Sequence, residues 1–179
     1  ERSGRWLGWE RKRGKLHETL RMLLDGDPGA FPVRVGDPGR LAGVRYVLTR
    51  DADTCLPPTC VAQLVATMAH PLNRAVVDAE GRVTDGYGVL QPRLEPSPLS
   101  ARRTPFTRAF AGDRGLDPYS TIVSDLHHDL FGEGNYAGKG LLDVEAFERS
   151  LERRVPEDAL LSHDLFEGMH ARTGLVTDV

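Results

Sequence analysis

The sequence predicts an α/β domain in which helices flank a mostly parallel β-sheet. Two observations carry this prediction. Short β-branched and aromatic segments alternate with longer segments of helical periodicity, and turns rich in glycine and proline separate them. The chain has 179 residues, of which 40% are hydrophobic and 27% charged, a balance typical of one globular domain with a core.

The first half of the chain begins with a predicted helix, because leucines recur at helical spacing over residues 9–24. A loop rich in glycine and proline follows at 25–39. The segment 44–49 (VRYVLT) is β-branched and aromatic, which is typical of a buried strand. Residues 57–70 are predicted to form a second helix, since the two prolines at its start are tolerated in a first turn.

The second half opens on a predicted hairpin, formed by β-branched residues at 76–77 and 82–84. The segment 86–94 (GYGVLQPRL) predicts a further strand, which a proline-rich stretch ends. Ser162 is expected to cap the last helix, and Gly174 to end it. The remaining predicted helices cover residues 100–112, 118–131, 143–151 and 162–172.

Composition narrows the classes of function. A net charge of −3 predicts no broad attraction to nucleic acid or anionic lipid, and no apolar run approaches the roughly 18 residues of a membrane helix. Residues 1–22 hold seven basic side chains against three acidic ones, which fits either a phosphate-binding patch or a solvated helix face. Cys55 and Cys60 are predicted to be free thiols in a reducing compartment, because two thiols without nearby histidines cannot complete a zinc site.

Asp51-Ala52-Asp53 directly follows the predicted strand 44–49. In open α/β sheets, ligands bind at the carboxyl ends of the strands. Two carboxylates one residue apart can bind Mg²⁺ or Mn²⁺ together with substrate phosphates, and the metal then neutralises a diphosphate leaving group. A plain surface turn is one alternative. A phosphatase of the haloacid-dehalogenase type is another, but it needs Thr or Val where this chain has Cys55.

Three further signals fit a site for a phosphorylated ligand. Asp164 lies in the first turn of the predicted last helix, where backbone N–H groups hold a carboxylate ionised and available as a general base. A simple cap is the alternative. Residues 138–140 combine two glycines, which let a ligand approach the backbone, with a lysine, although a plain glycine turn also fits. Residues 11–16 place basic side chains at a helix start, where phosphate binds readily.

The longest distinctive phrases are GWERKRGKL (8–16), RDADTCLP (50–57), AHPLNRAV (69–76), GYGVLQPR (86–93), GLDPYSTIVSDLHHDLFGEGNYAGKGLLDVEAFE (115–148) and LLSHDLFEGMHARTGLVTDV (160–179). Together they resemble the glycosyltransferase domain of cyclic β-1,2-glucan synthases. Their order also resembles the GT-A core of processive inverting glycosyltransferases, such as cellulose and hyaluronan synthases. The resemblance implies a GT-A-like fold and a metal-assisted, inverting transfer of glucose from UDP-glucose to a growing β-1,2-glucan.

The resemblance also implies roles for individual residues. Asp53 is expected to bind the metal, Mg²⁺ or Mn²⁺, that bridges the UDP diphosphate. Asp51 is expected to lie by the ribose or donor sugar and to share the metal site. Asp164 matches the general base that takes the proton from the acceptor hydroxyl. The other residues implied in binding the nucleotide sugar are Gly14, Lys15, Gln91, Gly138, Lys139 and Gly140.

By the same resemblance, residues 1–179 are a fragment of a single GT-A domain. The strands that hold the uracil, with another aspartate, and any product-side element are expected to lie outside it, so the fragment is not expected to turn over alone. The parent is expected to be large and membrane-embedded, with this part soluble on the cytoplasmic face of a bacterial inner membrane.

Two other classes of function remain open from the residues. One is a metal-dependent phosphoryl hydrolase that uses Asp51 and Asp53. The other is a non-catalytic, glycosyltransferase-like module that binds glucan or a partner, for which Asp51, Asp53 and Asp164 need not converge on one pocket.

Overall fold

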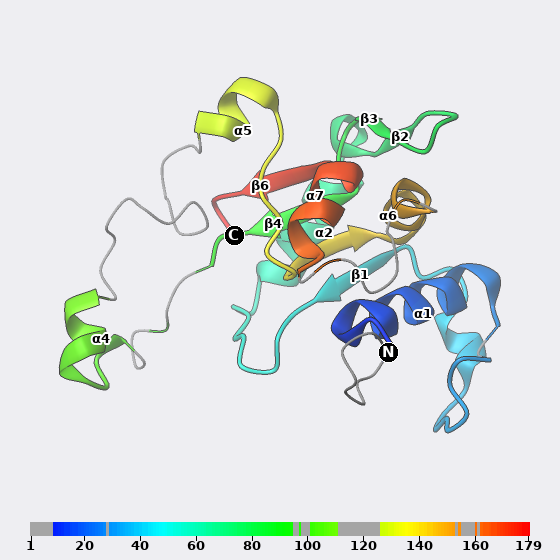
Figure 1. The fold of residues 1–179 in the computed structure, drawn as a ribbon, viewed down its shortest axis with the longest axis horizontal. Coiled ribbons are helices and arrows are strands. Elements are labelled where there is room, and N and C mark those ends of the chain that lie inside the picture. The colour runs from blue at the N-terminus through cyan, green and yellow to red at the C-terminus, as the bar shows by residue number, and fades with distance from the viewer. Residues whose placement is uncertain are drawn as a thin grey trace.

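A computed structural model of the chain describes residues 9–27, 29–94, 97, 101–110, 126–152, 154, 160 and 162–179. These residues form a four-stranded sheet with helices on both faces, and a separate two-stranded ribbon (Figure 1). The strands of the main sheet are β1 (Tyr46–Thr49), β4 (Val89–Pro92), β5 (Gly140–Asp143) and β6 (Thr173–Val176). The ribbon pairs β2 (Val76–Val77) with β3 (Val83–Asp85).

The α-helices are α1 (Arg11–Asp25), α2 (Cys60–Ala69), α4 (Pro105–Phe110), α5 (Leu126–Phe131), α6 (Val144–Leu151) and α7 (Asp164–Ala171). Two 3₁₀ turns, η1 (Pro38–Leu41) and η2 (Pro71–Asn73), lie in the connections. Within the described ranges, no helix combines the length and the apolar character that crossing a bilayer requires.

The sheet has the strand order β1-β5-β4-β6. β5 lies between β1 and β4 and runs antiparallel to both, whereas β4 and β6 are parallel. The prediction of a mostly parallel sheet is therefore wrong, because one reversed central strand makes two of the three ladders antiparallel. β1, β4 and β6 nevertheless run in the same direction, so their carboxyl ends meet at one edge.

Neighbouring residues of the central strands point into two different cores, as pleating requires. Leu142 of β5 packs with Leu20 of α1 and Phe147 of α6 on one face of the sheet. Leu141 packs with Leu64 of α2 on the other face. The sheet therefore carries α1, α6 and α7 on one side and α2 on the opposite side.

Several predicted elements are confirmed within the described residues: the first helix, the strand before Asp51, the hairpin, the strand at 86–94 and the helix at 143–151. α2 begins later than predicted, at Cys60, so Pro57 and Pro58 precede it. Within the predicted helices at 100–112 and 118–131, the structure describes α4 and α5, and residues 98–100 and 111–125 lie outside the described ranges.

The end of the chain differs more from the prediction. α7 begins at Asp164 with His163 in the N-cap position, so Ser162 is not the cap. Arg172 ends the helix with a positive φ of 52°, and Gly174 lies inside β6 rather than at a helix terminus. β5 and β6 were both missed, because four-residue strands that are buried almost throughout show no alternation of polar and apolar residues.

Candidate functional site

The candidate site begins where β1 ends. Asp51 opens a turn in which the Thr54 amide donates to the Asp51 carbonyl oxygen at 3.1 Å. The Arg50 guanidinium donates to the Thr54 carbonyl oxygen at 2.7 Å and so braces the same turn. This turn stands at the edge of the sheet where β1, β4 and β6 all end, the place where open α/β sheets bind ligands.

The Asp51 carboxylate is held by two lysines from distant parts of the chain. Lys12 Nζ of α1 lies 2.7 Å from Oδ1, and Lys139 Nζ lies 2.9 Å from Oδ2. Hydrogen bonds from Lys12 and then Lys139 lower the pKa of Asp51 to about 2. We call these three residues the lysine–aspartate cluster. The Asp51 carboxylate is therefore ionised throughout the physiological pH range.

Gly138 connects this cluster to Asp164. Lys12 Nζ donates to the Gly138 carbonyl oxygen at 3.0 Å. A Cβ placed on Gly138 would lie 2.9 Å from each carboxylate oxygen of Asp164, so that carboxylate rests directly against the glycine. The structure thus brings together Asp51, Lys139, Gly138 and Asp164.

Gln91 and Gly140 shape the backbone around the cluster. Gln91 is fully buried; its Oε1 accepts from the Ala137 amide at 2.9 Å, and its Nε2 donates to the Pro92 carbonyl oxygen at 2.8 Å. These bonds fasten the segment before Gly138 to β4. A Cβ on Gly140 would lie 2.4 Å from the Leu90 carbonyl oxygen, so only glycine permits this close strand approach. Direct ligand contact by either residue stays a prediction.

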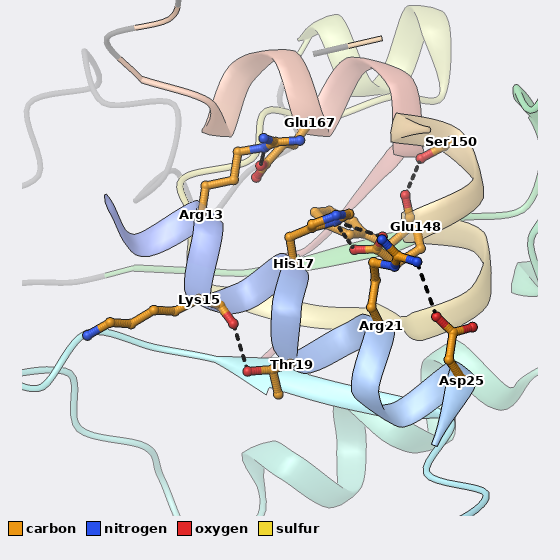
Figure 2. Close-up of polar contacts among 10 residues, drawn as sticks. Arg13, Lys15, His17, Thr19, Arg21, Asp25, Glu148, Ser150 and Glu167 are labelled. Atoms are coloured by element: carbon orange, nitrogen blue, oxygen red, sulfur yellow. Dashed lines mark hydrogen bonds and ion pairs between the residues drawn. The ribbon is translucent and has the colours of Figure 1, made fainter. Parts of the chain in front are cut away.

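The basic helix start contributes a different lysine from the one predicted. Gly14 is buried under Trp9, whose carbonyl oxygen would lie 2.1 Å from a Cβ at that position. Lys15 is exposed, and Figure 2 shows its side chain extending away from Arg13 and Glu167. Lys12, three residues earlier, is the one that reaches Asp51. Helical spacing alone does not choose between the two lysines, because residues three apart lie on nearly the same face.

A metal ion fits one member of the Asp51–Asp53 pair better than the other. Among the described residues, no group of three or more His, Cys, Asp or Glu could hold a metal ion. Asp51 is engaged by two ammonium groups, whereas Asp53 is exposed in the same turn. One exposed carboxylate suits Mg²⁺ or Mn²⁺ when substrate phosphates and water complete the coordination shell. Asp53 is thus the better candidate ligand.

Glu167 is a buried acid that the sequence motifs did not reveal. It lies one helical turn after Asp164, and its Oε1 accepts from Arg13 Nε of α1 at 3.1 Å. Burial raises the pKa of Glu167 to about 7, although the Arg13 charge opposes this shift; the nearby charges of Asp164 and Glu148 add to the rise. A sequence signal existed, since Glu167 shares its helix face with the buried Ala171.

This buried acid predicts a pH dependence of stability that a Glu167→Gln variant should lack. The folded state keeps the proton up to about pH 7, whereas the unfolded chain loses it near 4.5. The folded state therefore binds more protons between these values, and the free energy of unfolding should fall as pH rises through this window. Urea unfolding of both proteins from pH 4.5 to 8 measures the difference. Equal slopes would show that Glu167 titrates normally.

A cavity of about 390 Å³ adjoins the cluster at the ends of the strands. It shares Lys139 with the cluster, and its lining has Arg50 and Arg93 as further positive charges against one acid, Asp178. Cys55 and Cys60 also line it, and both are free thiols, as predicted. Asp51, Asp53 and Asp164 do not line it, so the cavity lies beside the acidic groups.

These features define a mixed α/β chain with a charged cluster and a basic cavity at the carboxyl ends of its strands. No protein-family profile matches the chain. The chain is related to cyclic beta-(1,2)-glucan synthase NdvB of Rhizobium meliloti (strain 1021), with 48% identity over 181 residues. The match covers all of this chain but only 6% of that protein, so the chain is similar to a small part of a much larger one.

Proposed function

We propose that this segment forms part of the catalytic centre of an inverting, metal-assisted glucosyltransferase of the GT-A type. It would transfer glucose from UDP-glucose to a growing β-1,2-glucan. The observation that carries the proposal is the meeting of Asp51, Lys139 and Asp164 around Gly138, although they lie far apart in the sequence. The relationship to part of a glucan synthase supports glucosyl transfer and the β-1,2 linkage.

On the donor side, the two lysines supply positive charge for a diphosphate. Lys12 and Lys139 both bind the Asp51 carboxylate, and their ammonium groups would bind the phosphate oxygens of the donor. Asp53 would hold Mg²⁺ or Mn²⁺, which supplies Lewis-acid stabilisation of the diphosphate leaving group when bound. The basic cavity that shares Lys139 offers room for further parts of the donor or acceptor.

On the acceptor side, Asp164 is suited to general-base catalysis. It lies in the first turn of α7, and its carboxylate rests against Gly138 next to the lysine–aspartate cluster. Asp164 would take the proton of the acceptor hydroxyl as that oxygen forms its bond to the anomeric carbon. The bond from that carbon to the diphosphate breaks on the opposite face, so an α-linked donor gives a β-linked product.

The larger parent would supply what this segment lacks for turnover, including the uracil-binding strands. We place the parent in a bacterial inner membrane with this segment on the cytoplasmic face, where UDP-sugars are made. Lys12 links Asp51 to the Gly138 carbonyl oxygen and Asp164 rests on the same glycine, which supports this function over a non-catalytic module; that Asp53 faces the same site is part of the proposal.

Calorimetric titration of UDP with Mn²⁺ tests the donor site. We expect metal-dependent binding by the chain and by an Asp25→Asn control, whose aspartate is exposed on α1, and loss of binding in Asp53→Asn. If the chain fails to bind, the titration should be repeated on a longer piece of the parent that adds the preceding strands, and continued failure there would overturn the proposal. Release of phosphate from small phosphoesters without affinity for UDP would instead indicate a metal-dependent phosphoryl hydrolase.

A further inference from the structure

The start of α1 makes contacts on both sides of Asp164. Glu10 Oε2 lies 3.1 Å from Nε2 of His163, the residue just before Asp164. Arg13 Nε lies 3.1 Å from Oε1 of Glu167, three residues after Asp164. Asp164 is thus bracketed by two side-chain pairs that tie the first turn of α7 to α1 (Figure 2 shows the Arg13–Glu167 pair).

The same helix turn also reaches the other acidic group of the candidate site. Lys12 lies between Glu10 and Arg13 in the sequence, and its ammonium group binds Asp51 and the Gly138 carbonyl oxygen. One turn of α1 therefore fixes the relative placement of Asp51, Gly138 and the helix start that carries Asp164.

Burial distinguishes these pairs from contacts on the surface; Arg13–Glu167 is an ion pair when Glu167 is ionised, and Glu10–His163 is one only when His163 is protonated. The exposed fractions of the side chains are 3% for Glu10, 12% for His163, 14% for Arg13 and 4% for Glu167. Desolvating an ion pair costs free energy that its attraction often fails to recover, and apolar replacements are commonly as stable. What such a pair does provide is a fixed geometry, because breaking it leaves a buried charge without its partner.

The neighbours of Glu167 leave Arg13 as its positive partner. Glu148 of α6, a second acid close to Glu167, is itself held by His17 Nδ1 at 2.9 Å. Arg13 and His17 lie one turn apart on α1, and Figure 2 shows both directed toward the helices that carry these acids. Each acid thus has its own basic residue on α1.

We propose that Arg13 and Glu167, together with Glu10 and His163, are positioning residues that hold the Asp164 carboxylate against Gly138 and the lysine–aspartate cluster. The pairs set the distance of the first turn of α7 from α1 and the rotation of α7 about its own axis. They act through Asp164 and do not touch the reacting atoms. The inference rests on the proposed function only for naming Asp164 the base; the geometric claim is independent of it.

The test uses the Gly138 amide resonance of this chain as a reporter of Asp164. In the otherwise unchanged chain, Asp164→Asn should shift that resonance, because the carboxylate rests on the glycine. In an Arg13→Gln background, the same substitution should no longer shift it. Arg13→Lys, which keeps the charge, should restore the shift at least in part. An Arg21→Gln background is the matched control, since Arg21 pairs with Asp25 on the exposed face of the same helix.

A merely stabilising role predicts a different result. Arg13→Gln would then lower the melting temperature, while the folded molecules would keep the full Gly138 response, and that outcome would overturn the inference. If Arg13→Gln does not fold, Arg13→Met, which keeps similar volume but cannot pair with Glu167, takes its place: loss of the Gly138 response in the folded variant supports the inference, and a full response there overturns it. Because UDP is absent from these measurements, failure here is distinct from failure of the UDP titration.

Discussion

An Asp164→Asn substitution is expected to lower the rate of glucosyl transfer by about two to four orders of magnitude in a parent protein that contains this segment. Asparagine keeps the shape of the side chain but cannot accept the proton of the acceptor hydroxyl. The substitution leaves the lysine–aspartate cluster unchanged, because the cluster contacts Gly138 through the Lys12 ammonium group, so binding of UDP should remain. The measurement is the initial rate of glucan formation from UDP-glucose, beside UDP affinity.

Glu145→Gln is the matched control for this substitution. Glu145 also occupies the first turn of a helix, α6, but its side chain is 72% exposed and pairs with Arg149 on the same helix. Both substitutions remove a negative charge near a helix N-terminus, which is worth about 0.3–1 kcal/mol of stability. Only Asp164→Asn should also stop transfer. Near-normal transfer by Asp164→Asn would show that another group serves as base.

Elements with strong local sequence patterns were predictable, whereas strands whose place and direction depend on tertiary pairing were missed. α1 and α6 follow directly from the spacing of their apolar residues. β5 is the opposite case: its four residues are all buried, so they show neither alternation nor the length of a helix. Its direction between β1 and β4 comes from the packing of distant segments. That single reversed strand accounts for the error in the predicted sheet type.

The residues of the candidate site likewise fall into those that local sequence patterns indicate and those that only tertiary packing reveals. Asp51, Lys139 and Asp164 each stood out in the sequence as separate signals, and the structure brings them around one glycine. Which lysine of the basic helix start joins them depends on the angle at which α1 meets the sheet. The position of Glu167 on the same helix face as Ala171 was a sequence signal for its burial, but its partner Arg13 lies 154 residues away in the sequence and could not be paired with it by local patterns. An acid in a first turn otherwise looks like an ordinary capping residue.

Gly138→Ala is expected to displace Asp164 while changing stability only moderately. The added Cβ would lie 2.9 Å from both carboxylate oxygens of Asp164, closer than side chains tolerate, and the short Asp164 side chain is the part that can move. Gly138 also has a φ of +71°, which costs an alanine roughly 1–2 kcal/mol. Moving a catalytic group by about 1 Å can reduce the rate on the order of 100-fold.

Gly26→Ala separates the cost of backbone strain from the displacement of Asp164. Gly26 follows α1 with the same φ of +71°, and a Cβ there meets nothing within 4 Å. The two variants should therefore lose similar free energies of unfolding in urea, since the backbone strain is the same. Only Gly138→Ala should lose glucosyl transfer in the parent protein. Equal loss of transfer in both variants would point to general destabilisation, whereas full activity in Gly138→Ala would mean that the contact between Gly138 and Asp164 does not set the position of the base.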